Sequence, residues 1–432
     1  MRSMHSVSRS LDSGRFLALA AHLARERGAD LLLSGPGYPG EKRSIVALDP
    51  LAELHIDADT TREQIKTFCF DTSGPNIVPG PTLGYLSYEL GMRLRGVATT
   101  KPAPLPQGHL KQYAALLIHD AEGETCTITA RDAGQARALA QLADTAPHAP
   151  AQARPSLPEP VSSLTQERYE QGVRRTLEHI LDGQTYQLNL SIRFDQPAPD
   201  LDSLALFLDL YSRHPAPFYA WFTSGQQRIL STSPERFLKV TDGQVMSQPV
   251  KGTLAYDANL AYDPALEEIL RSSPKEQAEL SMIVDLIRND ISHHCEYGSV
   301  RVEGHQSIFR VDNLLQMYSN VRGELRPGSD CLDLLFDAFP GGSVTGCPKH
   351  RAMELIDRLE PHSRGVYCGS FVCIENKQTM DSSICIRTAV HDLDQGRLTF
   401  YAGSGIVVDS DPASEYLETM AKAAKFLRGG KR

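Results

Sequence analysis

The order in which strands and helices follow one another is the feature that most constrains this chain. Strand-like segments come in runs instead of alternating one to one with helices, most clearly at residues 218–222, 229–231, 237–240 and 245–250. A parallel, doubly wound sheet needs a helical crossover between successive strands, whereas directly connected strands pair antiparallel. The pattern therefore predicts mixed, largely antiparallel sheets with helices packed outside, an α+β fold.

A segment rich in proline, alanine and serine divides the chain. Residues 145–164 read TAPHAPAQARPSLPEPVSSL, a composition that cannot build a core and is typical of a linker or a long exposed loop. The 432 residues are enough for two or three ordinary domains or for one large interwoven one. We expect an N-terminal region over residues 1–150 and a second region over residues 161–428.

Charge and hydropathy narrow the possible partners. The chain has 44 Lys and Arg residues against 53 Asp and Glu, so its formal net charge is −9. This balance gives no electrostatic reason to expect nucleic acid or an anionic membrane, and an anionic substrate needs a local positive site. No apolar run approaches the roughly 18 residues of a membrane span, the start lacks the apolar segment of a signal peptide, and the eight cysteines form no CxxC motif. We expect a soluble cytoplasmic protein with reduced thiols.

Motifs of several common enzyme classes are missing or incomplete. No GxGxxG opens a helix after a strand, and no GxSxG nucleophile elbow occurs. The tract GGSVTGCPK is similar to a Walker A loop, but Cys347 and Pro348 separate its last glycine from Lys349. Dinucleotide, hydrolase and P-loop chemistry therefore have no support.

Two predicted helices each carry a pair of glutamates three residues apart, on one helix face. The pairs are Glu276 with Glu279, on a helix over residues 275–291, and Glu415 with Glu418, on a helix over Pro412–Leu427. Facing helices of this kind offer four carboxylates to a hard divalent cation, most naturally Mg²⁺. The alternative is two solvated helix faces, and spacing alone does not show that the helices meet.

The tract FPGGSVTGCPKHRAMELI, residues 339–356, combines two glycines with the hydroxyls of Ser343 and Thr345 and with Pro348 near a helix start. Free N–H groups and the positive end of a helix dipole suit a carboxylate or phosphate. Ordinary N-capping explains the same residues.

Arg387 lies in a strand expected over residues 382–390, where its neighbours are largely apolar. It needs a partner there, either a ligand carboxylate held through two nitrogens or an internal acid such as Asp381. The tract AGSGI that follows the next strand permits close backbone approach at Gly403 and Gly405, or simply a bend.

Glu235 in STSPERF and Lys251 in QPVKGT flank a strand–turn–strand segment. If these strands pair, both side chains can face one cleft, where a carboxylic acid protonates a leaving hydroxyl and a lysine acts as nucleophile or electrostatic anchor. A lysine before Gly-Thr is, on its own, an ordinary surface turn residue.

Taken together, these segments resemble the chorismate-utilising enzymes. The matching tracts follow the order of the family, cover essentially all of residues 165–427, and read YQLNLSIRF, STSPERFLKV, PVKGT, KEQAELSMIVDLIRND, AFPGGSVTGCPKHRAMELID, RGVYCGSFVCI, DSSICIRTAV and AGSGIVVDSDPASEYLETMAKA. The tracts LLLSGPG, RSIVALDPLAEL and GYLSYELG resemble the family's N-terminal portion. The resemblance implies an anthranilate synthase component I-like fold, with two large, mostly antiparallel sheets packed as a sandwich, helices outside, and both chain regions interwoven in one globule.

Lys251 indicates a branch of this family. A lysine in this tract is characteristic of aminodeoxychorismate synthase component I, whereas anthranilate synthases usually have alanine. The resemblance then implies a Mg²⁺-dependent transferase that replaces the 4-hydroxyl of chorismate by an amino group. The product is 4-amino-4-deoxychorismate, a precursor of para-aminobenzoate and folate, and the ammonia comes from a glutamine amidotransferase partner.

The resemblance also assigns roles. Glu235 matches the general acid for the departing 4-hydroxyl. Lys251 matches a lysine proposed to add at C2 of the ring before ammonia attacks C4, for which it must be unprotonated. The matched metal ligands, which hold Mg²⁺ at the ring carboxylate, are Glu279 and Glu418, supported directly or through water by Glu276 and Glu415. The matched substrate-binding residues are Tyr367, Arg387 and Gly405 at the enolpyruvyl carboxylate, with Ser343 and Lys422 in the same pocket.

The chain departs from the family pattern at two places. Gln316 stands where many relatives have the histidine of an HLVS tract, and glutamine cannot act as an acid. Leu33 replaces the glutamate of the segment that forms an aromatic amino-acid pocket in relatives. The residues that still match this pocket, and that imply L-tryptophan as a ligand, are Ser34, Arg43, Pro217, Phe218 and Tyr219.

Three other interpretations stay open at this point. Anthranilate synthase component I is one, and salicylate or isochorismate synthases are another; Lys251 argues against the first. The third interpretation comes from a different class: a catalytically silent ligand-binding homologue. Against it stand the intact Glu235, Lys251, Arg387 and four helix glutamates.

Overall fold

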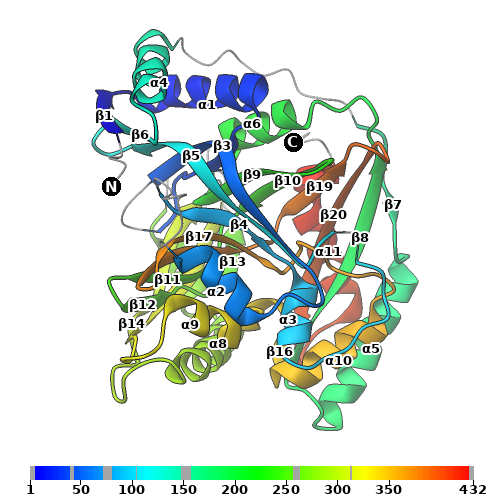
Figure 1. Ribbon diagram of the computed structural model, residues 1–432. Coiled ribbons are helices and arrows are strands. Elements are labelled where there is room, and N and C mark those ends of the chain that lie inside the picture. The colour runs from blue at the N-terminus through cyan, green and yellow to red at the C-terminus, as the bar shows by residue number, and fades with distance from the viewer. Residues whose placement is uncertain are drawn as a thin grey trace.

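The computed structural model describes residues 5–38, 43–71, 80–103, 105–146, 157–255, 263–311 and 314–427 (Figure 1). Its helices are α1 (Ser13–Arg27), α2 (Arg62–Phe70), α3 (Tyr88–Leu94), α4 (Ala133–Thr145), α5 (Gln166–Leu181), α6 (Ser203–Arg213), α7 (Ala265–Arg271), α8 (Pro274–Ser292), α9 (Cys331–Ala338), the 3₁₀ turn η1 (Gly342–Val344), α10 (Lys349–Leu359) and α11 (Pro412–Leu427).

The strands are β1 (His5–Ser10), β2 (Asp30–Leu33), β3 (Arg43–Ile56), β4 (Thr82–Leu86), β5 (Gly108–Asp120), β6 (Thr125–Ala130), β7 (Val161–Ser162), β8 (Gln187–Pro197), β9 (Phe218–Ser224), β10 (Gln227–Ser233), β11 (Arg236–Thr241), β12 (Gln244–Ser247), β13 (Val250–Ala255), β14 (Arg301–Val311), β15 (Leu314–Glu324), β16 (Gly346–Cys347), β17 (Ser370–Asn376), β18 (Thr379–Ile384), β19 (Thr388–Asp392) and β20 (Arg397–Ile406). From β9 to β13 no helix intervenes, which confirms the predicted run of strands.

The strand pairings in the described part of the chain are antiparallel, as predicted, and connect the strands into one sheet. One arm runs β6–β5–β3–β2–β9–β10–β19–β20–β8. The other arm runs β5–β4–β17–β18–β11–β12–β15, and β13 and β14 also pair with β15.

The expected sandwich of two separate sheets is therefore wrong for the described residues. The reason is the length of β5, which has 13 residues. Along one edge, residues 115–120 pair with β6 and residues 108–111 pair with β4. Because one long strand serves two neighbours, the two arms stay joined by hydrogen bonds instead of forming independent layers.

Strands from the two ends of the chain pair directly. β2 pairs with β9, and β4 pairs with β17. Of the expected linker, residues 147–156 lie outside the described residues, and α4 ends at Thr145. The division into regions 1–150 and 161–428 stays a prediction.

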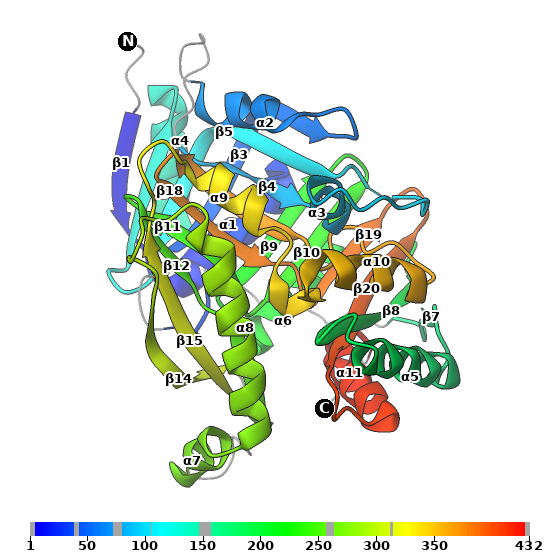
Figure 2. The same ribbon diagram turned by 90° about the horizontal axis from the view of Figure 1, so that it is seen from below.

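Two large hydrophobic cores lie between the sheet and the helices. One is covered by α1, α4 and α6 and extends to α5 and α11, and the other is covered by α8 and α9. Figure 2 shows α5 and α11 side by side, with α8 at the other arm of the sheet. None of the described helices is long and apolar enough to cross a membrane.

The helices α8 and α11 begin in the same way. Ser273 accepts a hydrogen bond from the amide of Glu276 at the start of α8, and Asp411 accepts one from the amide of Ser414 at the start of α11. A proline occupies the first position of each helix, where its missing N–H costs nothing. Both helices therefore start where the sequence predicted, and this fixes the ExxE pairs in their first turns.

Candidate active site

Glu235 is a buried carboxyl group directly before β11. Its side chain is 6% exposed, and Ser343 Oγ donates a hydrogen bond of 2.9 Å to its Oε1. Burial raises the pKa of Glu235 to about 7, while the hydrogen bond from Ser343 acts in the opposite direction. Three cations also act to lower this pKa: Lys251, Lys422 and Arg387. A carboxyl group balanced in this way holds a proton near neutral pH and can donate it.

The hydrogen bond from Ser343 to Glu235 also shows what this hydroxyl of the glycine-rich loop binds. Ser343 lies in η1, and Pro348 caps α10 without a side-chain hydrogen bond. N-capping by the loop hydroxyls, the alternative raised from the sequence, is therefore wrong for Ser343. A Cβ at Gly342 would lie 2.3 Å from Leu286 Cδ2, so an alanine here would displace the Leu286 side chain where η1 packs against α8.

Lys251 lies in β13 and points into the same site, with its side chain 17% exposed. Its Nζ is 3.8 Å from Glu279 Oε2, and a Cβ at Gly405 of β20 would lie 3.3 Å from it. The surface-turn reading of this lysine is therefore wrong. The next residue, Gly252, has φ +80°, and a Cβ there would lie 3.2 Å from Glu276 Oε2. Glycine thus allows the carboxylate of Glu276 to approach the backbone beside Lys251.

Carboxylates from the two ExxE helices lie near this lysine. Burial raises the pKa of Glu276, and the negative charges of Glu279 and Glu418 raise it further, so carboxylates from α8 and α11 are close enough to repel. Burial also acts to raise the pKa of Glu418, but Lys422, 2.7 Å from its Oε1, and Lys251 outweigh it and leave the pKa below its usual value. The solvated-face alternative is therefore wrong for Glu276 and Glu279, whereas the side chain of Glu418 is still 50% exposed.

Glu415 lies one turn before Glu418 and is 5% exposed. Ser410 Oγ donates a hydrogen bond of 2.6 Å to its Oε1, whereas its Oε2 has no hydrogen-bond partner among the described residues. A buried carboxylate oxygen in this state is an acceptor for a metal-bound water. Clustered, mutually repelling carboxylates with a spare oxygen fit Mg²⁺, which prefers oxygen ligands and retains several waters.

Arg387 ends the strand in which it was expected. β18 stops at Ile384 and β19 begins at Thr388, so the predicted continuous strand over residues 382–390 is wrong. The reason is the backbone of Arg387, which has φ 49° and whose carbonyl accepts hydrogen bonds from the amide (3.0 Å) and Oγ1 (2.9 Å) of Thr232. The break directs the guanidinium close enough to Glu235 to influence its pKa. Asp381, the internal partner considered for Arg387, is bound by both Nε and Nη2 of Arg236.

Of the remaining predicted substrate residues, Lys422 lies close enough to Glu235 to influence its pKa. Tyr367 is 4% exposed and stacks on Tyr401, with centroids 5.1 Å apart and planes inclined by 8°. Lys422 Nζ donates a 3.3 Å hydrogen bond to the carbonyl of Gly403. β20 continues through Gly403 and Gly405, and a Cβ at Gly403 would lie 2.5 Å from the carbonyl of Leu190. The glycines therefore allow close strand packing, and the bend considered from the sequence is wrong.

Two amides of β8 were missed by sequence reasoning. Gln187 is 1% exposed, and neither side-chain polar atom has a partner among the described residues; the same holds for Asn189 Oδ1. Gln187 Nε2 lies 2.9 Å from the position of a Cβ at Gly405, and Lys251 Nζ lies 3.3 Å from the same position, so the amide and the lysine are neighbours. Unpaired buried amides are rare and suit a polar ligand. The signal was present in YQLNLS, where the alternating polar residues look like a solvated face but are buried.

Gln316, which replaces the family histidine, lies on β15 opposite Thr253 of β13, two residues from Lys251. It is 5% exposed, and its Oε1 has no partner among the described residues. The position is therefore next to the strand that carries Lys251, and its side chain offers hydrogen bonds only.

A second cavity contains all five residues predicted for an amino-acid pocket. They are Ser34, Arg43, Pro217, Phe218 and Tyr219. Inside it, Arg43 Nη1 lies 3.0 Å from Glu375 Oε1, and Leu33 occupies the position of the relatives' glutamate. The pocket therefore offers aromatic and paired charged groups on one wall, which suit a zwitterionic amino acid.

Comparisons with known proteins identify the family. A family model described as chorismate binding enzyme matches residues 30–428. Aminodeoxychorismate synthase component 1 of Klebsiella aerogenes is 36% identical over 90% of this chain and 84% of its own. Anthranilate synthase component 1 of Pseudomonas putida is 40% identical over 63% of this chain and 54% of its own. The crystal structure of anthranilate synthase component I from Streptococcus pneumoniae TIGR4 superposes with a TM-score of 0.77 at 26% identity, covering 91% of this chain and 94% of the other. This chain belongs to the family of chorismate binding enzymes.

Proposed function

We propose that this chain is the aminating component of an aminodeoxychorismate synthase, which replaces the 4-hydroxyl of chorismate by ammonia. The observation that carries the proposal is the position of Lys251, which lies 3.8 Å from Glu279 and acts electrostatically on Glu235. The amine of Lys251, in its unprotonated form, gives the site a nucleophile between an acid and a carboxylate cluster, which alanine cannot supply. The relative of 36% identity over most of both chains supports the same reaction.

The reaction begins with attack of Lys251 Nζ on C2 of the ring. The two ring double bonds shift toward C4, the C4–O bond breaks, and Glu235 gives its proton to the departing hydroxyl, which leaves as water. Ammonia then attacks C4, the double bonds return, and the C2–N bond to Lys251 breaks. The displaced proton of ammonia returns to the ionised Glu235, so atoms and charge balance and pyruvate is retained.

Mg²⁺ would be held by Glu279 and Glu418, with Glu276 and Glu415 supporting it directly or through water. It supplies positive charge for the ring carboxylate, which explains how a chain of net charge −9 binds a dianion. The mutual repulsion of these carboxylates supports the assignment, because a cation among them would relieve it.

Cationic and polar groups orient the second carboxylate of the substrate. Arg387 and Tyr367 hold the enolpyruvyl carboxylate, and the amide of Gly405 donates to it. Lys422 and the unpaired amide of Gln187 line the rest of the site for this carboxylate. Two separated carboxylates held by a metal and by an arginine fix the ring between Glu235 and Lys251.

Ammonia comes, in this proposal, from a glutamine amidotransferase partner, as the name component 1 of the relatives implies. The reaction serves para-aminobenzoate and folate synthesis in the cytoplasm. The second cavity, with Arg43 and Glu375, takes L-tryptophan.

The test is an amination assay with purified chain, chorismate, Mg²⁺ and ammonium, coupled to a lyase that converts aminodeoxychorismate to para-aminobenzoate. Appearance of para-aminobenzoate only with the lyase supports the proposal. Lys251→Ala is expected to lower kcat/KM by at least about 10³-fold, the scale of a lost nucleophile. Unchanged turnover of this variant would refute the nucleophilic role.

Anthranilate synthase is the second candidate, since two such relatives are 40% identical over 62–63% of this chain. The same assay separates the two, because anthranilate forms without the lyase and with release of pyruvate. Absence of any turnover by a folded, Mg²⁺-loaded chain would favour a silent ligand-binding homologue.

A further inference from the structure

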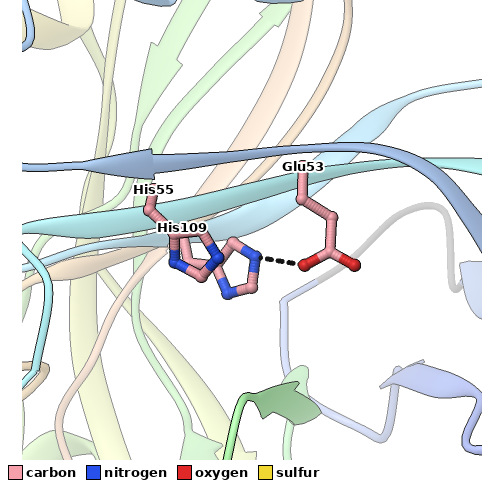
Figure 3. Close-up of side chains that lie close together, drawn as sticks. All are labelled: Glu53, His55 and His109. Carbon is pink, nitrogen blue, oxygen red and sulfur yellow. Dashed lines mark hydrogen bonds and ion pairs between the residues drawn. The ribbon is translucent and has the colours of Figure 1, made fainter.

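Two histidines and a glutamate meet on the β3–β5 pair, on strands that carry none of the catalytic residues. Glu53 and His55 are two positions apart on β3, so their side chains share a face, and His55 lies directly opposite His109 of β5. Figure 3 shows the three side chains gathered on this face. One ligand atom from each, an imidazole nitrogen or a carboxylate oxygen, lies within 4.8 Å of the other two.

The three side chains differ in exposure. His109 is fully buried, whereas Glu53 and His55 are exposed. His109 Nε2 lies 2.9 Å from Glu53 Oε2, and the rings of His55 and His109 are 3.9 Å apart. One donor is therefore anchored in the core while the other two can rotate from the solvent side without disturbing the sheet.

A hydrogen bond behind His109 prepares its outward nitrogen. His109 Nδ1 lies 2.9 Å from Ser224 Oγ of β9. In one tautomer, Nδ1–H donates to this hydroxyl, and the lone pair of Nε2 then faces the carboxylate of Glu53. Nε2 and Glu53 Oε2 are both hydrogen-bond acceptors in this state. Because they lie 2.9 Å apart, they require a cation between them. In the other tautomer, Nε2–H donates to Glu53 and the hydroxyl of Ser224 donates to Nδ1. A proton and a metal ion thus compete for one position, and Ser224 supports both states, as partners of metal-binding histidines do.

Lys111, which lies directly opposite Glu53 on β5, is engaged with other groups. Lys111, two residues along β5 from His109, is ion-paired with the buried Asp30 at 3.0 Å and donates to Thr223 Oγ1 at 2.9 Å. Its ammonium lies over the ring of Phe222, 4.4 Å from the centroid. The negative charge of Glu53 is therefore left for an incoming ion.

We infer that Glu53, His55 and His109 bind one divalent transition-metal ion of the zinc class. Two imidazoles and one carboxylate, with water as a fourth ligand, match the donor set that Zn²⁺ takes at distances of about 2.0–2.2 Å. Mg²⁺ and Ca²⁺ prefer oxygen donors and are rejected here, so the site differs in chemistry from the glutamate cluster of α8 and α11. The bound ion ties the end of β3 to the start of β5 and stabilises the folded chain by mass action.

The test is a zinc titration of untagged protein by competition with a chromophoric chelator, in excess Mg²⁺ so that the glutamate cluster is occupied. The expected result is one zinc per chain, with affinity reduced at least about 100-fold in His55→Ala and about 10-fold in Ser224→Ala. His55 is exposed, so its variant keeps the fold, which circular dichroism verifies. Zinc is also expected to raise the Tm of the wild type and not that of His55→Ala.

Two control variants distinguish zinc bound at this site from zinc bound elsewhere on the chain. His22→Ala removes an exposed histidine of α1, and Glu279→Gln removes a carboxylate of the other cluster. Both are expected to keep one zinc per chain. The inference is overturned if the wild type takes up no stoichiometric zinc, if His55→Ala binds like the wild type, or if Glu279→Gln abolishes uptake. None of these readouts depends on the amination reaction.

Discussion

Replacing Glu235 by glutamine removes the proposed general acid, and it should make the protein more stable than the wild type at high pH. Burial holds the pKa of this carboxyl at about 7 in the folded chain, above the ordinary value of 4.5. The folded state therefore keeps a proton that the unfolded state releases between these pH values. By linkage, stability falls as pH rises from about 4.5 to about 7 and then levels off. Glu235→Gln is neutral throughout and escapes this loss.

The magnitude follows from the shift. Each pKa unit corresponds to about 1.4 kcal/mol, so ionising Glu235 in the folded chain costs about 3 kcal/mol in total. About 2 to 3 kcal/mol of this falls between pH 5 and pH 8. Glutamine is of nearly the same size and can still accept the hydrogen bond from Ser343, so packing changes little.

The measurement compares the free energy of unfolding of wild type and Glu235→Gln by urea titration at pH 5 and pH 8, in EDTA. The variant should gain about 2 to 3 kcal/mol relative to wild type on going to pH 8. Glu303→Gln is a control without this pH dependence, because Arg301 holds the pKa of Glu303 below its usual value and the group is already mostly ionised in both states at pH 5. An equal free-energy difference for Glu235→Gln at both pH values would refute the reasoning that burial raises this pKa.

Four further results are expected. Gln187→Leu should raise the free energy of unfolding by about 1–3 kcal/mol, since it removes unpaired buried polar atoms. The same variant should lower kcat/KM at least about 10-fold. A destabilised, active variant would contradict the substrate role. Gly405→Ala should lower kcat/KM at least about 10-fold with the fold intact by circular dichroism, because its Cβ would lie 2.9 Å from Gln187 Nε2. Millimolar Mg²⁺ should raise the Tm of wild type and not that of Glu279→Gln, and equal Tm shifts would remove Glu279 from the metal site. Arg43→Ala should weaken L-tryptophan binding at least about 10-fold by calorimetry, and unchanged affinity would place the amino acid elsewhere.

Local signals in the sequence predicted the helices that build the site. A capping residue followed by proline marks the starts of α8 and α11, so the positions of the ExxE pairs in the first turns could be predicted. Whether the two helices meet depends on tertiary packing, and spacing within each helix contains no information on it.

The errors arose where tertiary contacts override a local pattern. β4 ends at Leu86 although the apolar tract continues to Tyr88, because Ser87 caps α3 by accepting from the amide of Leu90. The strand expected through Arg387 breaks because its carbonyl bonds to Thr232 of another strand. The fork of the sheet at β5 follows from which strands share its edge, a choice made by long-range pairing.

Buried polar residues were the other source of error. In β8 the polar positions of YQLNLS look like a solvated face, but both faces of this strand are covered. A sequence alternating in polarity predicts one exposed face only when nothing packs on it. The buried amide of Gln187 was therefore missed, because its position in the alternating pattern looked solvent-facing.

The central claim is that nitrogen enters chorismate at C4, and one measurement tests it most directly. The purified chain is supplied with chorismate, Mg²⁺ and ¹⁵N-labelled ammonium, and the product is read by NMR through the carbon bonded to ¹⁵N. The account predicts ¹⁵N on C4 with the enolpyruvyl group retained, and loss of this signal in Lys251→Ala. Nitrogen on C2 of an aromatic ring, with free pyruvate, would contradict it.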